Sequence, residues 1–279
     1  MNYKITALAE NTTYRHNVLA QHGQSLLIEV EDYKLLFDVG EVPGSVMHNM
    51  RQIGVELENI NDIVISHRHI DHIGALSDMI SSLDGQRVIL PEQAGEPHIK
   101  EASEKYVFLE PNPDGGYDLA IEEDELNIIK EYGNTSVVEE NGMHLSNDIY
   151  TTGCEGDWMR EQAIVIDQHE LGIVLLVGCS HPTVEVLLEK AKKVTGNEKV
   201  RGIIGGFHYP DLSDTEIREK AHSFDEMGLE FLIPSHCTTV RGALILQGVL
   251  GEKVHMSKTY TLGAGNSIEI SNELKLNLV

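Results

Sequence analysis

Four side chains that can bind metal ions occur within six consecutive residues of the sequence. His67, His69, Asp71 and His72 form an HxHxDH pattern directly after the apolar stretch 62–66. Imidazole nitrogens and carboxylate oxygens are common ligands of zinc and of other transition metals. A solvated loop, or a helix start capped by Asp71, would also be polar, but neither favours histidine. The pattern therefore predicts a metal site.

The elements expected on either side of this pattern explain its spacing. We expect residues 63–66 to end a strand, so that the first two histidines, two positions apart, project the same way and share one ion. Residues 73–80 have the apolar spacing of a short helix that ends by Gly85. The last two residues of the pattern then lie at the strand-to-helix turn, ready to hold a second ion beside the first.

Three other apolar stretches are followed directly by residues that bind metals. These are Cys179 and His181 after residues 175–177, His208 after residues 203–204, and His236 after residues 232–234. A layered α/β protein places its reactive groups at the carboxyl ends of its strands, so we include all four as candidate site residues. The competing interpretations are an ordinary buried residue for Cys179, a helix N-terminal residue for His181, and hydrogen bonding at a glycine turn for His208.

The order of expected elements is similar in the two halves of the chain. The first half has a hairpin at 25–30 and 33–38, a helix at 45–53 and the strand at 63–66; the second has a hairpin at 163–167 and 173–177, helices at 184–193 and 213–228, and strands at 200–204 and 230–234. We therefore expect one α+β domain over residues 1–279, with two sheets packed face to face and helices outside. Residues 91–152 are polar and weakly periodic, which predicts a loop-rich insertion that either lines the substrate pocket or is a solvated decoration.

Composition limits the kinds of partner that the protein can have. The 279 residues include 45 acidic and 21 basic ones, for a net charge of -24. This charge argues against a surface that binds nucleic acid, because such a surface needs basic residues. Three cysteines without framework spacing indicate a reducing compartment, and no apolar run has the length of a membrane span. We expect a cytoplasmic protein with a small-molecule substrate, no nucleic-acid partner and no membrane partner.

The chain resembles the metallo-β-lactamase superfamily along nearly its whole length. Leu36-Phe37-Asp38 is similar to the first motif of that superfamily, HxHxDH to the second, Cys179 to the position of its bridging Asp or Cys, and His236 to its last histidine. Within the superfamily, the segments at 178–181, 205–208 and 236–237 resemble the dihydropterin-ribofuranosylaminobenzene phosphate synthase-like branch. The resemblance implies a four-layer αββα sandwich.

The resemblance also implies roles for the candidate residues. One ion would be held by His67 and His69 and a second by Asp71, His72 and His236, with Cys179 near both and Asp38 orienting a ligand histidine. One or two zinc ions are expected, and iron or manganese also suit these ligands.

The activity implied by the resemblance is hydrolysis, by metal-activated water, of an ester or phosphoester of a small metabolite. The catalytic candidates are Asp71, with His181 and His208 as proton donors or substrate clamps. The alternative is a metal-dependent synthase, transferase or binding protein for a phosphorylated pterin-like metabolite. A di-iron redox protein is a third interpretation, but it usually pairs with a flavin domain, and no flavin motif is visible.

One stretch of the sequence departs from the superfamily pattern. The histidine that usually precedes the second-half hairpin is absent from residues 156–162. Asp157, Glu161, His144 or His181 could replace it, or the first ion site is depleted. His22, directly before the first hairpin, also remains open as a candidate site residue.

Overall fold

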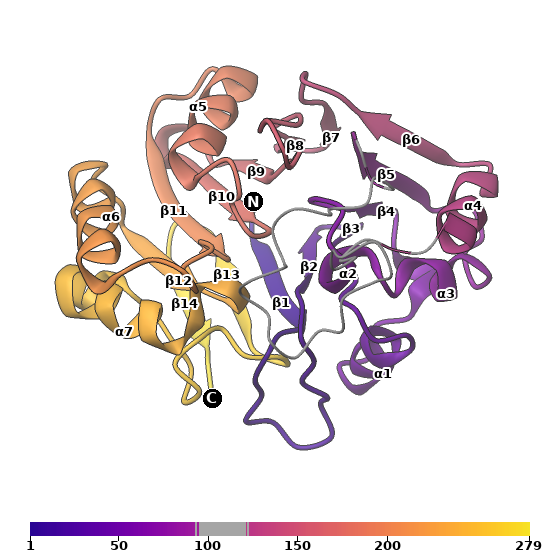
Figure 1. Ribbon diagram of the computed structural model, residues 1–279, viewed down its shortest axis with the longest axis horizontal. Helices are drawn as coiled ribbons and strands as arrows, with labels where there is room; N and C mark the ends of the chain where they lie inside the picture. Colours follow the sequence, from indigo (N-terminus) through magenta and orange to yellow (C-terminus); the bar gives the residue numbers. More distant parts are fainter. Residues whose placement is uncertain (93, 95–120, 122) are drawn as a thin grey trace, which may run out of the picture.

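Two β-sheets pack face to face, and helices cover the outer face of each sheet (Figure 1). The computed structural model describes residues 1–92, 94, 121 and 123–279. The predicted α+β class and four-layer αββα sandwich are therefore confirmed. Among the described residues, no helix has the length and apolar composition needed to cross a membrane.

The larger sheet combines the N-terminal part of the chain with its C-terminal end. In spatial order its strands are β14 (Leu274–Asn277), β13 (Ser267–Ile270), β1 (Tyr3–Ala9), β2 (Ser25–Val30), β3 (Tyr33–Phe37), β4 (Asp62–Val64), β5 (Arg87–Pro91) and β6 (Thr135–Val138). The predicted hairpin is formed by β2 and β3, whereas β3 to β6 run parallel to one another. The carboxyl ends of the parallel strands therefore share one edge, and the HxHxDH pattern follows β4 at that edge.

The smaller sheet is formed by the second half of the chain. In spatial order its strands are β12 (Phe231–Pro234), β11 (Val200–Gly205), β10 (Ile173–Val177), β9 (Ile164–Asp167), β8 (Ile149–Thr151) and β7 (His144–Ser146). The three strands β10, β11 and β12 are parallel, so their carboxyl ends lie side by side. The remaining candidate ligands follow these three strand ends.

Among the described residues, alternation along the strands produces one hydrophobic core between the sheets and one between each sheet and its helices. In β10, Val174 and Leu176 lie in the core between the sheets, while Leu175 and Val177 face the helices. Burying each such side chain contributes roughly 1.5–3 kcal/mol.

The helices over the larger sheet are α1 (Ser45–Gln52), α2 (Ile70–Ile73), α3 (Leu76–Ile80) and α4 (Glu123–Glu131), and those over the smaller sheet are α5 (Val184–Thr195), α6 (Asp214–Glu226) and α7 (Thr239–Leu250). The described residues also form the 3-10 turns η1 (Leu57–Asn59), η2 (His169–Leu171), η3 (His236–Thr238) and η4 (Gly251–Lys253).

The elements around the HxHxDH pattern differ in two ways from the prediction. The strand ends at Val64 instead of residue 66, because the Ser66 amide donates its hydrogen bond to the Asp38 carboxylate, at 2.6 Å, and not to a neighbouring strand. The helix begins at Ile70 and is divided in two, so Asp71 and His72 lie within α2 and not in a turn before the helix.

Part of the predicted insertion at 91–152 lies outside the described residues, namely 93, 95–120 and 122. The described remainder forms α4 and the short strands β6, β7 and β8, which extend the two sheets. A role of this segment in the substrate pocket stays a prediction.

Candidate metal centre

The two histidines of the HxH part of the pattern face each other at the edge of the larger sheet. His67 Nε2 lies 3.1 Å from His69 Nδ1, and both side chains are buried. Burial, together with the neighbouring imidazoles of His72, His181 and His69, holds the pKa of His67 well below its usual range. A neutral imidazole offers a lone pair, which is the form that binds metal ions. The predicted pairing of these two histidines is present.

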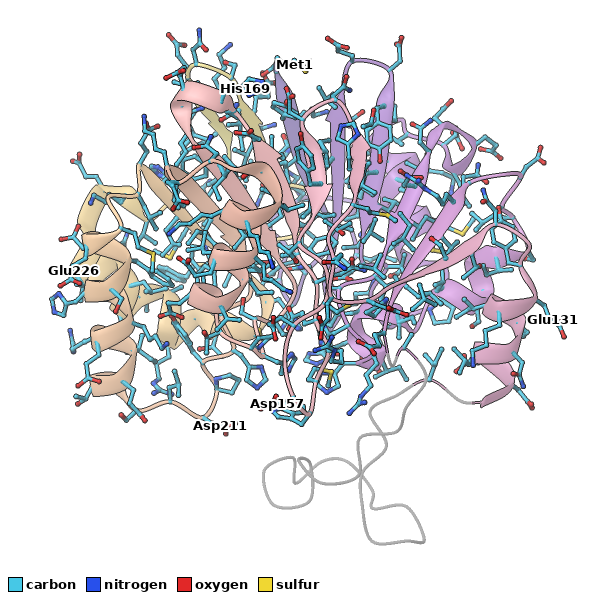
Figure 2. All side chains as sticks on the ribbon, turned by 90° about the horizontal axis from the view of Figure 1, so that it is seen from above. Met1, Glu131, Asp157, His169, Asp211 and Glu226 are labelled. Carbon is cyan, nitrogen blue, oxygen red and sulfur yellow. The ribbon has the colours of Figure 1, made fainter. Side chains whose placement is uncertain are left out.

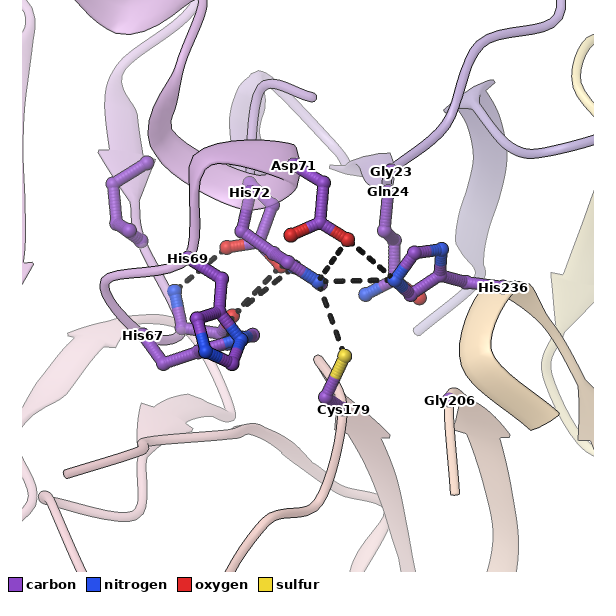
Figure 3. Close-up of polar contacts among 12 residues, drawn as sticks. Gly23, Gln24, His67, His69, Asp71, His72, Cys179, Gly206 and His236 are labelled. Carbon is purple, nitrogen blue, oxygen red and sulfur yellow. Dashed lines mark hydrogen bonds and ion pairs between the residues drawn. The ribbon is translucent and has the colours of Figure 1, made fainter. Parts of the chain in front are cut away.

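Asp71, His72 and His236 form a second group beside the first. Asp71 Oδ2 lies 3.0 Å from His236 Nε2 and 3.7 Å from His72 Nε2, and the two Nε2 atoms are 3.3 Å apart. Figure 3 shows the three side chains pointing toward one another from α2 and from the end of β12. Burial raises the pKa of Asp71, but His72, His22 and His236 together bring it well below its usual value, so the carboxyl is ionised.

Cys179, directly after β10, lies between these two groups. Its Sγ is 3.2 Å from His72 Nε2. The ligand atoms of Cys179, His67 and His181 all lie within 4.8 Å of one another, and the same holds for Cys179, His72 and His236. A thiolate at this position can contact an ion in either group.

Asp38, directly after β3, orients His72 from behind. Its Oδ2 accepts hydrogen bonds from His72 Nδ1 at 2.7 Å and from Ser66 Oγ at 2.9 Å. Because Nδ1 donates to Asp38, Nε2 is the ring atom of His72 that faces the other candidate ligands. Burial lowers the pKa of His72, but Asp71 and Asp38 outweigh it and raise the pKa to about 9. The orienting contact predicted for Asp38 is present.

His181 lies where the missing histidine would be needed. Its ring centroid is 4.7 Å from that of His67 and 4.8 Å from that of His69, and its Nε2 is buried without a hydrogen-bond partner. An unpartnered buried nitrogen is costly unless something binds it, and a metal ion would satisfy it. Of the other substitutes considered, Asp157 and His144 are exposed, and Glu161 acts through His181.

Glu161 holds the whole turn that carries Cys179 and His181. Its Oε1 accepts the backbone N–H groups of Cys179 and Ser180 at 2.9 and 2.8 Å. Its Oε2 accepts the backbone N–H of His181 and the His181 Nδ1–H at 2.8 and 2.9 Å. Burial raises the pKa of Glu161, and these backbone donors partly offset that effect. The carboxylate thereby leaves His181 Nε2 free to face the site.

Three further side chains lie next to these groups. His208 stacks near His181, with ring centroids 4.4 Å apart, and Cys237 lies close to Cys179 and His208. His22 Nε2 is 3.2 Å from Asp71 Oδ2, although its side chain is 64% exposed. His22 reaches Asp71 because Gly23 packs against the Asp71 carbonyl, where an added Cβ would lie 2.1 Å from the oxygen. The sequence leaves His22 open, and Cys237 enters only through the family resemblance of the segment 236–237; neither is predicted as a ligand.

Four residues at the site have a left-handed backbone conformation. Asp38, Ser180, His208 and His236 adopt positive φ angles of 62°, 61°, 52° and 45°. This left-handed conformation is uncommon for residues other than glycine, and such strain is typically found at functional sites.

Two hollows adjoin the cluster. One, of about 310 Å³, is lined by residues 155–159, His181, Pro182 and Val186. The other, of about 150 Å³, lies between His181, His208 and the aromatic residues Phe207, Tyr209 and Phe224. The loop at Asp157 lies at the opposite end of the molecule from Met1 and His169 (Figure 2). The site is thus beside space that a small molecule can enter.

All eight candidate ligands and catalytic residues predicted from the sequence meet in this one cluster. The donor set of imidazoles, one carboxylate and thiols, together with the unpartnered His181 Nε2, fits a transition-metal centre. The chain lines the site from both sheets, as Figure 3 shows for the residues around Cys179.

Comparison with protein families and with curated sequences gives two findings. The family model of the anti-Pycsar protein Apyc1 matches residues 13–85, which include the first hairpin and the HxHxDH pattern. The 7,8-dihydropterin-6-methyl-4-(β-D-ribofuranosyl)-aminobenzene-5'-phosphate synthase of Methanocaldococcus jannaschii is 27% identical over 270 residues, which cover 85% of this chain and 88% of the archaeal protein.

Solved structures match nearly the whole fold. Tm1679, described as a metal-dependent hydrolase of the β-lactamase superfamily, superposes with a TM-score of 0.76 at 24% identity and covers 96% of this chain and 99% of its own. The metallo-β-lactamase fold protein YhfI from Bacillus subtilis has a TM-score of 0.56 at 14% identity, covering 92% and 97%. The chain therefore has the metallo-β-lactamase fold, and its sequence resembles the archaeal ribofuranosylaminobenzene phosphate synthase.

Proposed function

We propose that this protein is a metal-dependent hydrolase that acts on an ester or phosphoester of a small metabolite. The observation that carries the proposal is the convergence of candidate ligands from both sheets at the carboxyl ends of β4, β10 and β12, beside two hollows. The Nε2 atoms of His72 and His236 lie 3.3 Å apart and both face the Asp71 carboxylate, an arrangement that a shared metal cation would stabilise.

We assign the ligands to two neighbouring positions. His67, His69 and His181 would hold one ion; Asp71, His72 and His236 would hold the other; and Cys179 would contact both. Zinc is our first choice, and iron and manganese suit the same donors. Ions bound here would supply Lewis acidity, which provides hydroxide near pH 7 and polarises a carbonyl or phosphoryl oxygen.

The residues of the chain perform the remaining tasks. Asp38 and Glu161 fix the tautomers of His72 and His181, so that Nε2 of each ring faces the centre. Asp71, ionised and close to both His72 and His236, would orient the attacking water by accepting a hydrogen bond from it. His208, next to His181, is our candidate for the group that clamps the substrate or donates a proton to the leaving oxygen.

The size of the hollows indicates the class of substrate. Volumes of about 310 and 150 Å³ are of the size that holds a small molecule or part of one. We accordingly propose a small-molecule substrate, with or without a phosphate group. The net charge of -24 and the three cysteines support our further proposal of a cytoplasmic protein that binds neither nucleic acid nor membrane.

A second function is favoured by one finding, the similarity to the archaeal synthase along 85% of this chain. In that case bound metal ions would hold a phosphorylated pterin-like metabolite for a synthase or transferase reaction, or for binding alone, and would not activate water.

Metal analysis and a substrate panel distinguish the two functions. Protein purified without chelator would be tested on phosphodiester, phosphomonoester, lactone and thioester substrates. The hydrolase proposal requires turnover of at least one of these substrates. The His69→Ala variant should lose both this turnover and its bound metal. Full metal content without turnover of any ester would instead favour the second function.

A further inference from the structure

We propose a third cation position, built by Cys179, His208 and Cys237, that takes a soft or borderline divalent ion such as Zn²⁺ or Cd²⁺. It shares Cys179 with the two-ion centre but is otherwise made of side chains that the proposed hydrolysis does not use as ligands. The ligand atoms of the three residues lie within 4.8 Å of one another.

The topology of the smaller sheet brings these three residues together. They follow the carboxyl ends of β10, β11 and β12, which are adjacent parallel strands with β11 in the middle. Cys179 and Cys237 therefore have to approach each other across the end of β11. The chain has Gly206 at that crossing, where an added Cβ would lie 2.6 Å from Cys237 Sγ and 2.5 Å from the Gly178 carbonyl oxygen. The absence of a side chain is what allows the two thiols to meet.

Hydrogen bonds hold the three strand ends in this arrangement. The His208 backbone N–H donates to Cys237 Sγ at 3.2 Å, and the Tyr209 N–H donates to the Cys237 carbonyl at 3.1 Å. Ser180 Oγ donates to the Gly206 carbonyl at 2.8 Å, which ties the turn after β10 to the turn after β11. His208 itself is held at a φ of 52°. The ligand positions are thus fixed by the backbone before any ion binds.

The chemistry of the three side chains selects the ion. Two sulfur atoms and one imidazole match the donor types of zinc sites and exclude hard ions such as Mg²⁺ and Ca²⁺. Cys179 is buried, whereas Cys237 and His208 are partly accessible, which provides a path for the ion. With three protein ligands, a tetrahedral ion keeps one open position for water or a substrate atom, as catalytic zinc sites do.

The three cysteines of the chain permit a controlled test. Full-length protein is equilibrated with excess Cd²⁺ and desalted; bound cadmium is counted by mass spectrometry, and the near-ultraviolet absorbance of sulfur-to-cadmium charge transfer is recorded. We expect Cys237→Ser to lose one equivalent of cadmium and about half of this absorbance, since one of two liganding thiolates is removed. His208→Ala should lose the same equivalent and a similar share of the absorbance, because no cadmium then remains beside Cys237. Cys154→Ser is the matched control, because Cys154 is buried with its Sγ against the Val138 carbonyl, and it should change neither quantity.

Two outcomes separate this proposal from the proposed function. If Cys237→Ser, shown to be folded by circular dichroism, binds as much cadmium and absorbs as strongly as the wild type, the third position does not exist. If His69→Ala keeps its full metal content, the two-ion centre is wrong, and the cadmium absorbance that depends on Cys237 still decides the third position.

Discussion

Replacing Glu161 by glutamine should weaken metal binding without removing any ligand. Glutamine has nearly the same shape as glutamate, but only one of its two terminal atoms accepts hydrogen bonds. Oε1 of Glu161 accepts two backbone N–H groups, and Oε2 accepts the N–H and the Nδ1–H of His181. The single amide oxygen of Glu161→Gln can accept hydrogen bonds from only one of these two pairs of N–H donors.

Each orientation of the amide disturbs a proposed ligand. If the oxygen serves Cys179 and Ser180, the amide group faces His181, which must accept at Nδ1 and therefore carry its proton on Nε2, the atom needed for metal. If the oxygen serves His181, the backbone around Cys179 loses its acceptor. Two bonds to a buried charge are lost in either case, each worth roughly 1.5–3 kcal/mol, so the free energy of unfolding should fall by about 3–6 kcal/mol. Residues that orient metal ligands typically change metal affinity by about 10–100-fold, and we expect a loss in that range.

The measurement is competition for zinc with a chromogenic chelator, together with urea unfolding of the metal-free protein. Glu189→Gln is the matched control, since Glu189 is exposed and only pairs with Lys192 on α5; its unfolding free energy should change by less than about 1 kcal/mol. Wild-type affinity for every ion in Glu161→Gln would refute the role assigned to Glu161 and His181.

Three further predictions concern metal removal and buried groups. Chelation should lower the unfolding temperature and metal should restore it, since an ion at 100 times its dissociation constant stabilises the fold by about 2.7 kcal/mol; an unchanged melting curve would contradict this. Burial raises the pKa of Tyr3 and Tyr209 in the folded protein. Their contribution to the free energy of unfolding is therefore complete below a pH of about 10, which is the pKa of tyrosine in the unfolded chain, and it is lost as the pH rises further. Urea unfolding from pH 9 to 11 should show a falling free energy of unfolding, and constant stability across that range would be evidence against it. Burial raises the pKa of Cys154 to about 11, so iodoacetamide at pH 8 should label it only after unfolding; labelling of the native protein, detected by peptide mass spectrometry, would show that the residue is accessible.

The metal cluster is partly encoded in local sequence and partly in long-range contacts. His67, His69, Asp71 and His72 could be predicted because their spacing is set within one turn of chain. Cys179, His181, His208 and His236 could be placed because each follows an apolar strand, and parallel strands end at a common edge.

The remaining features depend on contacts between distant segments. Glu161 and Cys237 act through hydrogen bonds and packing against other strand ends, and His22 reaches the site only because Gly23 packs on Asp71. The pairing of β1 with β13 joins the two ends of the chain, which no local pattern reveals. The strands β6 and β7 are short and half-exposed, so they lack the apolar alternation that marks an inner strand.

Metal content per chain tests the central claim most directly. Protein purified without chelator, and a folded His69→Ala variant prepared in parallel, would be measured by inductively coupled plasma mass spectrometry. We expect two or more equivalents of a transition metal in the wild type and a clear loss in the variant. Wild-type protein that binds less than one equivalent even after incubation with excess zinc, or a His69→Ala variant with undiminished content, would contradict it.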